Sequence, residues 1–463
     1  MKYDFFEPLP KIIPVGKPTE FVLRGRYMQR QISFLTRNAK LVLETIPANG
    51  LFADGTLPDW EEMQQYPYSI PENDPDALHF TVTPEEEGEI VFVLFQEFPN
   101  GKRERIAKIN VYALLPDLYK LTPYRGDLHV HSSHSSCAPR NEDPKYVAAR
   151  ARYLGLDFMA LTDHIQYHGS EVAYDFIKSQ DVAFQLYHGE ECHLLRHHVD
   201  GPIFCIIPVL THNHIVSVGA SQGVIQYSND HFEEYQREVR RRADKISHTL
   251  DEEVRFSMAG ADWVFDMIHK FGGIGIFAHP FWRTADRLNL PAAVREYIFE
   301  SGKFDAIEVI GGATAATGKI AEDGYECNMR CLNWYTDLCI KQGRRIPLVG
   351  NTDSHSSREA TPEDPWGLDL RLGTEYSIVF AEDPTFEKIA AGIRAGRSVA
   401  CIHPQQHPAQ IFGDFRLVSY AYFLEREYFP EHNRQCRREG EKLLAALQHD
   451  EDLKPENYGH LRG

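Results

Sequence analysis

The sequence predicts an α/β protein in which an antiparallel β-sandwich-like domain precedes a distorted seven-stranded β/α barrel and a helical C-terminal extension. Short apolar runs separated by turn residues fill positions 1–122, and this texture is typical of antiparallel sheets. From Tyr124 onward, apolar runs alternate with helical segments, which favours a parallel α/β sheet. We therefore expect three parts, at residues 1–122, 123–402 and 403–463.

Composition sets limits on the class of protein. The chain has 463 residues, more than the roughly 100–200 of an ordinary domain, so we expect two or more domains. Its 43% hydrophobic and 25% charged residues are globular values and exclude a largely disordered chain. The sequence shows no secretory signal and no run of about 18 apolar residues. With only eight cysteines, these features favour a cytoplasmic protein without a membrane span.

Charge and histidine content point to a small substrate and a metal. The formal net charge of −18 disfavours a long nucleic acid, which needs clustered basic residues. A small anionic substrate held by metal ions remains compatible with this charge. Of the 22 histidines, half lie between His129 and His214, and such a concentration favours metal binding.

The first 122 residues contain six candidate strands. They are FVLRGRY (21–27), ISFLTR (32–37), LVLETI (41–46), LHFTVT (78–83), EIVFVLFQEF (89–98) and IAKINVYALL (106–115). Turn sequences such as PANG and ENDPDA separate them, as in a small antiparallel sandwich. We find no catalytic group of residues here, which favours a scaffold or lid role.

Seven apolar strands are predicted in the central part, with helices between them. The strands are DLHVH (127–131), LDFMALT (156–162), AFQLYHGE (183–190), HIVSVGA (214–220), GIGIFA (273–278), FDAIEVI (304–310) and IPLVGN (346–351). The main helices are expected at 144–155, 231–250, 261–272 and 325–343. A further strand (375–381) and helix (384–396) follow, before a charged helical tail. Active sites of such barrels lie at the carboxyl ends of the strands.

Polar clusters that suit metal binding occur at the ends of six of these strands. They are Asp127–His131, Thr162–His164, Gly189–Glu191, His212–His214, Ala278–Pro280 and Asp353–His355. His129 and His131 are two residues apart on a strand, so both imidazoles face one side and can reach one ion. Because the six clusters recur in register with successive strand ends, they predict a single metal centre.

Five short sequences resemble, in their order along the chain, the motifs of the PHP (polymerase and histidinol phosphatase) superfamily of metallohydrolases. They are DLHVHS, ALTDH, GEE, AHP and NTDSH. The resemblance covers about residues 124–357, and the N-terminal β-domain resembles the carbaryl-hydrolase-like branch. It implies two or three divalent ions, and mixed imidazole and carboxylate ligands suit Zn, Mn or Fe. The implied ligands are His129, His131, Glu190 and Asp353 for one ion, Glu190, His279 and a fourth-strand histidine for a second, and His164 with His355 for a third.

Two positions of this pattern stay open. For the fourth-strand ligand we favour His214, and the alternatives are His193, His197, His198 and His212. In the first motif, Ser136 stands where the family often has an acid. Cys137 or His134 can replace that acid as a ligand, or the third site is empty.

The expected reaction is hydrolysis of a small phosphate ester or diester by a metal-bound hydroxide. Asp163 is the candidate catalytic carboxylate, for orientation or proton transfer, with capping of the next helix as the alternative. Arg283 and Arg358 are candidate substrate-binding residues, because arginine matches phosphate or carboxylate groups.

Two other functions are weighed against the phosphoesterase. An ester, carbamate or amide hydrolase needs an apolar wall, which Phe281 and Trp282 can supply. A metal-binding module without catalysis is the third reading. Asp127 is interpreted as either a support of the metal ligands or a turn-forming residue at the strand end, and Glu308 as facing either the barrel mouth or a structural ion pair.

Overall fold

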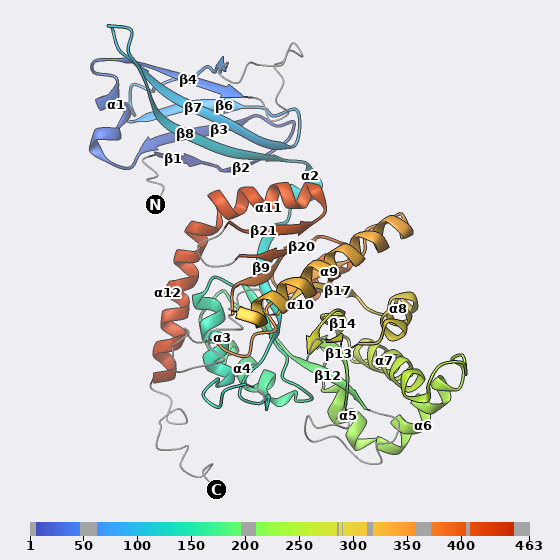
Figure 1. Cartoon of the computed structure of the whole chain (residues 1–463). Coiled ribbons are helices and arrows are strands. Elements are labelled where there is room, and N and C mark those ends of the chain that lie inside the picture. The colour runs from blue at the N-terminus through green and yellow to red at the C-terminus, as the bar shows by residue number, and fades with distance from the viewer. Residues whose placement is uncertain are drawn as a thin grey trace. The chain divides into compact units, whose positions relative to one another are not determined.

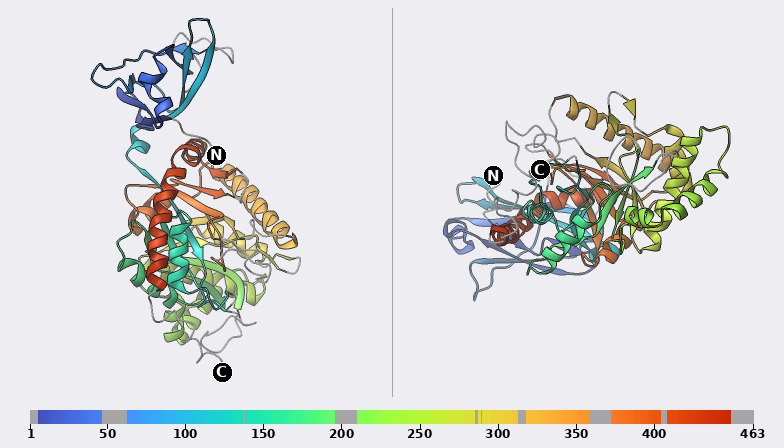
Figure 2. Two further views of the ribbon diagram at one scale, coloured as in Figure 1. Left: turned by 90° about the vertical axis from the view of Figure 1, so that its left-hand side faces the viewer. Right: turned by 90° about the horizontal axis from the view of Figure 1, so that it is seen from below.

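The computed structural model describes residues 6–46, 63–136, 138–195, 210–284, 287–288, 290–312, 318–357, 372–403 and 408–448. These ranges form a mixed α/β protein with several sheets and twelve α-helices (Figures 1 and 2). The chain divides into two compact units, residues 1–122 with 422–428, and residues 123–421 with 429–463. None of the helices in the described ranges is long and apolar enough to cross a membrane.

The first unit contains two sheets with one shared core. One sheet has the order β1 (Phe6–Leu9), β3 (Thr19–Gly25) and β6 (Ala77–Val82), and the other has the order β2 (Ile12–Pro14), β8 (Arg103–Leu114), β7 (Gly88–Glu97), β4 (Lys40–Ile46) and β5 (Gln64–Gln65). The ring of Phe80 on β6 lies 5.0 Å from that of Phe21 in the same sheet and 5.1 Å from that of Phe92 on β7 of the other sheet. Both sheets therefore bury their apolar faces in the same core.

One predicted strand of this unit is wrong. Residues of the ISFLTR run form the short helix α1 (Ile32–Leu35), after the 3₁₀ turn η1 (Met28–Arg30). Ile32 and Leu35 are both buried, three residues apart, and the Thr36 hydroxyl donates to the Ile32 carbonyl. A turn of helix places both apolar side chains in the core, which alternation along a strand would not do.

The second unit is built on two larger sheets. The six-stranded sheet has the order β11 (Gln185–Tyr187), β10 (Phe158–Leu161), β9 (Thr122–Val130), β19 (Glu375–Ala381), β20 (Ser398–Ile402) and β21 (Gln410–Gly413). The five-stranded sheet has the order β12 (Gly189–Leu195), β13 (Leu210–Val218), β14 (Ile274–Phe277), β17 (Ala306–Gly311) and β18 (Leu348–Asn351). A two-stranded ribbon, β15 (Arg283–Thr284) with β16 (Arg287–Leu288), follows β14.

Helices follow most of these strands, and the predicted helices at 144–155, 231–250, 261–272 and 325–343 are confirmed as α3, α6, α7 and α9. The helices after α1 are α2 (Pro116–Tyr119), α3 (Pro144–Tyr153), α4 (His168–Lys178), α5 (Val224–Asp230), α6 (Phe232–Ala243), α7 (Glu252–Lys270), α8 (Ala292–Ser301), α9 (Gly318–Gln342), α10 (Phe386–Arg394), α11 (Phe415–Glu427) and α12 (Phe429–Gln448). Asp143 caps α3 by accepting from the Lys145 N–H. Helix α12 packs beside α3 (Figures 1 and 2).

The strand directions depart from the predicted parallel sheet. Strands β9, β10 and β11 pair in parallel, and so do β14, β17 and β18. In contrast, β13 is antiparallel to both β12 and β14, and β20 is antiparallel to both β19 and β21. The predicted strand 183–190 is also divided between β11 and β12, which belong to different sheets. An apolar run marks a buried strand, but it carries no information on the direction of the neighbouring strand.

Two single-residue bridges connect the sheets near the carboxyl ends of β9, β10 and β18. Val130 pairs with Ser354, which follows β18, and His164, which follows β10, pairs with Glu191 in β12. The bridges bring the polar residues after these strands into one region.

Candidate metal centre

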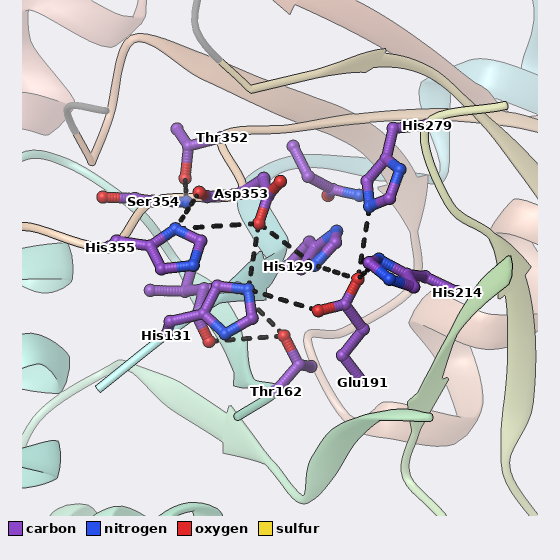
Figure 3. A network of polar contacts seen from close by, with 12 residues as sticks. His129, His131, Thr162, Glu191, His214, His279, Thr352, Asp353, Ser354 and His355 are labelled. Carbon is purple, nitrogen blue, oxygen red and sulfur yellow. Dashed lines mark hydrogen bonds and ion pairs between the residues drawn. The ribbon is translucent and has the colours of Figure 1, made fainter. Parts of the chain in front are cut away.

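Nine side chains that can bind metals gather where these strands end, and Figure 3 labels all of them except His164 and His193. Each comes from a strand or from the segment that directly follows one. They are His129 and His131 from β9 and its end, His164 after β10, Glu191 and His193 on β12, His214 on β13, His279 after β14, and Asp353 and His355 after β18.

Glu191 lies in the middle of the cluster, and its two carboxylate oxygens face different imidazoles. Oε1 lies 2.8 Å from Nδ1 of His214 and 3.2 Å from Nε2 of His279. Oε2 lies 2.5 Å from Nδ1 of His164 and 3.5 Å from Nε2 of His193. One buried carboxylate therefore joins two groups of nitrogen donors.

Glu190, the residue predicted for this position, points to the opposite side of β12. Its Oε1 accepts from the backbone N–H groups of Val224 and Ile225 at the start of α5. Successive side chains of a strand alternate between its two faces, so Glu191 and His193 lie together on the face opposite to that of Glu190. The structure thus replaces Glu190 by Glu191 in the cluster, while burial raises the pKa of Glu190 to about 7.

Asp353 is the second carboxylate of the cluster. Its Oδ1 lies 2.9 Å from Nε2 of His131 and 3.3 Å from Nε2 of His129. The rings of His131 and His355 stack beside it, with centroids 4.1 Å apart. Asp353 has a φ of 50° and His279 a φ of 24°. Non-glycine residues in this region store strain of about 1–3 kcal/mol and often lie at functional sites.

Glu308 contacts His129 directly and therefore lies next to the cluster. The His129 Nδ1–H donates to Glu308 Oε1 at 3.1 Å. Glu308 also accepts from the Asn351 amide at 2.7 Å and from the His279 backbone N–H at 2.9 Å. A neutral imidazole that donates through Nδ1 leaves a lone pair on Nε2, and in His129 this atom faces Asp353.

Asp163, the predicted catalytic carboxylate, lies behind His131 and reaches it through Ser135. The Ser135 hydroxyl donates to Asp163 Oδ1 at 2.7 Å. Having used its one hydrogen, this hydroxyl accepts from the His131 Nδ1–H at 3.0 Å. The Ser132 N–H and hydroxyl also donate to Asp163, each at 2.7 Å. Helix α4 begins only at His168, so the alternative role as its cap is not found.

Asp127 lies on β9, two residues before His129, and holds this part of the strand in place by hydrogen bonds. Its buried carboxylate accepts from the Thr352 hydroxyl at 2.5 Å and from the backbone N–H of His129 at 3.1 Å. Burial raises the pKa of Asp127 to about 7. Asp127 therefore ties the strand that carries His129 to the segment that precedes Asp353.

The electrostatics of the cluster favour a bound cation. Within the described residues, His129 Nε2 and Glu191 Oε2 are buried and make no hydrogen bond of ordinary geometry, although ionisable groups lie 3.3 Å and 2.5 Å from them. Burial lowers the pKa of His129, but Asp353, Glu308 and Glu191 outweigh burial and leave that pKa well above its ordinary value. Burial alone would raise the pKa of Glu191, yet the surrounding imidazoles hold it well below its ordinary value. The carboxylates that raise the pKa of His129 stabilise positive charge in the cluster, and a divalent ion can supply that charge in place of the proton.

The donors form four overlapping groups of three, each compact enough for one ion. The groups are His131–His164–His355, His129–His131–Asp353, His129–Glu191–His279 and His164–Glu191–His193. Imidazole and carboxylate donors together suit transition metals rather than Ca²⁺.

The structure brings together both His193 and His214, between which the sequence left a choice. They are register partners on β12 and β13, and their rings stack with centroids 3.9 Å apart. The signal for His193 was its spacing of two residues from Glu191. The alternatives His197 and His198 lie outside the described residues, as does the side chain of His212.

Two predicted substrate-binding arginines have different outcomes. Arg283 Nη1 lies 2.6 Å from Glu326 Oε2 in an ion pair. Arg358 lies outside the described residues, and so does Cys137. The ring of His134 lies 5.7 Å from that of His168 and is not part of the cluster.

The predicted apolar wall is divided between core and site. Phe281 is buried, with its ring 5.6 Å from that of Trp334. Trp282 is 37% exposed, and its ring lies 5.5 Å from that of His214 and 5.6 Å from that of His279. Only Trp282 therefore lies against the candidate metal ligands.

Comparisons with known proteins give similarity only at a low level. No family model matches the chain, and no curated protein matches it. Among solved structures, a proposed metal-dependent phosphoesterase from Bifidobacterium adolescentis is 16% identical, with 53% of this chain and 91% of that chain covered and a TM-score of 0.32. The lesion-specific endonuclease EndoQ from Pyrococcus furiosus is 16% identical, with 63% and 58% covered and a TM-score of 0.32. An amidohydrolase from Chromobacterium violaceum is 16% identical, with 53% and 90% covered and a TM-score of 0.30.

Proposed function

We propose that the chain is a divalent-metal-dependent hydrolase of the PHP type that cleaves a small phosphate ester or diester. The observation that carries the proposal is the meeting of Glu191 and Asp353 with imidazoles whose outer nitrogens are held by hydrogen bonds. Metal-binding histidines are oriented in this way. The proposed ligands of two or three Zn, Mn or Fe ions are His129, His131, His164, Glu191, His214, His279, Asp353 and His355.

Bound ions would polarise the scissile ester and bring the pKa of a nearby water close to neutrality. The chain itself holds two of these proposed ligands, His129 and His131, in one tautomer. Glu308 fixes the tautomer of His129, and Asp163 fixes that of His131 through Ser135. We therefore assign Asp163 as a positioning residue, because it acts on the site through another side chain.

The more exposed edge of the cluster supports a proposal for the side from which the substrate enters. The side chain of Asp353 is 18% exposed and that of His355 is 12% exposed, whereas those of His129 and Glu191 are fully buried. A substrate would approach over Asp353 and His355. Since the net charge is −18, we propose a small anionic substrate rather than a long nucleic acid.

The proposal includes the barrel expected from the sequence. Strands β9, β10, β12, β13, β14, β17 and β18 follow one another through ladder pairs and through the bridges Val130–Ser354 and His164–Glu191. This succession supports a distorted seven-stranded barrel, although its pairs are only partly parallel. The shared core of the two N-terminal sheets supports a sandwich.

A carboxyl ester, carbamate or amide is the second candidate substrate. The observation that favours it is Trp282, whose exposed ring lies against His214 and His279. An aromatic leaving group can stack on such a ring. Arg283, which the sequence predicted to bind a phosphate, forms an ion pair with Glu326 instead.

The test combines metal content with parallel assays. The purified protein is measured for bound metals and assayed with an aryl phosphate, an aryl phosphodiester, an aryl ester and a short DNA duplex. We expect metal in the wild type and activity on a phosphorus ester. His129→Ala should lose both, whereas His248→Ala, which removes an exposed histidine far from the cluster in the sequence, should keep both.

Each outcome separates the readings. Activity on the aryl ester alone would replace the phosphoesterase by the second candidate. A metal-loaded protein that is inert on all four substrates would favour a binding module. Full activity in His129→Ala would show that the reaction takes place elsewhere.

A further inference from the structure

The fourth residue after Gly189 on β12 is His193, which the sequence offered only as an alternative to His214. His193 is buried, with a relative exposure of 4%, and faces the same side of β12 as Glu191. Its Nε2 lies 2.7 Å from Nδ1 of His164 and 3.5 Å from Oε2 of Glu191. The third side of this triangle, from Nδ1 of His164 to Oε2 of Glu191, is 2.5 Å.

The backbone fixes this triangle. The Glu191 N–H donates to the Asp163 carbonyl at 3.1 Å, and the Ile165 N–H donates to the Glu191 carbonyl at 2.9 Å. These bonds hold His164 and Glu191 side by side. His193 is held in turn by its register pairing with β13 and by the stacked ring of His214. The backbone pairing therefore places the three side chains next to one another.

We propose that His193 is a metal ligand that completes, with His164 and Glu191, an additional ion position. The proposal rests on the proposed function, since it assumes that the cluster binds metals. Two imidazole nitrogens and one carboxylate oxygen suit Zn, Mn or Fe. The position shares Glu191 Oε2, whereas Oε1 faces His214 and His279. Glu191 would thereby bridge two ions, one at each oxygen.

The competing role for His193 is a hydrogen bond that orients His164 without contacting metal. Loss of such an outer partner costs about 10–100-fold in metal affinity. His193→Gln keeps a hydrogen-bonding group but removes the imidazole. If His193 is a ligand, this variant should lose one equivalent of tightly bound metal, measured by elemental analysis after dialysis. His248→Gln is the matched control and should keep the wild-type content.

A second variant tests directly whether the side chain at position 193 contacts a metal ion. In His193→Cys loaded with Co²⁺, a ligand position should give a thiolate-to-cobalt charge-transfer band that the wild type and His248→Cys lack. The band and the loss of metal in His193→Gln would support the proposal. Full metal content in His193→Gln together with no band in a folded His193→Cys would overturn it. A wild type that binds no metal would instead refute the proposed function itself, so the two failures are distinguishable.

Discussion

Helix α12 is tied to the second unit by a histidine–carboxylate pair, and this pair predicts a pH-dependent stability. The His432 Nε2–H donates to Asp157 Oδ1 at 2.6 Å. Asp157 also accepts from Arg152 Nη1 at 2.9 Å and from the Arg125 backbone N–H at 3.0 Å. Burial lowers the pKa of His432, but Asp157 together with Cys436 outweighs burial and raises that pKa from 6.5 to about 9.

The size of the effect follows from this pKa. A rise of about 2.5 corresponds to about 3.4 kcal/mol, because one pKa unit equals about 1.36 kcal/mol. The side chain of His432 is 18% exposed, and solvent screening reduces the contribution to roughly 1–2 kcal/mol. Since the pKa is raised on folding, this stabilisation is complete below pH 6.5 and disappears as the pH rises through about 9.

The assay is urea unfolding of the wild type and His432→Gln at about pH 6 and about pH 9.5. Other groups titrate in this interval, so the informative quantity is the difference between the two proteins at each pH. We expect the wild type to exceed the variant by roughly 1–2 kcal/mol at the lower pH and by much less at the higher pH. Equal differences at both pH values would refute the reasoning, because the pair would then contribute nothing that titrates.

Three further predictions concern the cluster. Glu191→Gln should lose bound metal and activity, whereas Glu190→Gln should keep its metal content, and elemental analysis of both distinguishes the two assignments; equal loss in both would contradict the geometry. Ser135→Ala should lower kcat/KM by about 10–100-fold with a smaller change in KM, because His131 loses its outer hydrogen bond; unchanged kinetics would remove the positioning role of Asp163. Removal of metal with a chelator should lower the free energy of unfolding by about 4 kcal/mol for each ion that is present at 1,000 times its Kd, and a Tm insensitive to the chelator would contradict binding to the folded state.

Much of the site was predictable because strand periodicity is local. The spacing of His129 and His131 places both imidazoles on one side of a strand, and the structure brings both to Asp353. The choice between Glu190 and Glu191 depends instead on the register of β12 against β13. A shift of one residue exchanges the two faces of a strand, and the sequence of β12 alone does not contain this register.

The strand directions and outer contacts were less accessible to sequence reasoning. HIVSVGA has the apolar character of a buried strand, but its antiparallel pairing with β12 and β14 depends on distant segments. The role of Ser135 likewise depends on Asp163, which is adjacent only in the folded chain. Motif order located most of the clustered side chains, with Glu190 in place of Glu191 as the exception, whereas their supporting contacts required the three-dimensional structure.

The membership of residues 422–428 in the first unit has a consequence for the order of synthesis. Within that unit, the Asn110 side-chain amide donates to Glu427 Oε1, and the Lys11 ammonium donates to the Glu427 carbonyl. A ribosome makes the first 122 residues early, but it must translate residues 123–421 before Glu427 exists. The first unit therefore cannot include residues 422–428 until nearly the whole described chain has been made. A fragment that stops at Thr122 would lack this segment permanently.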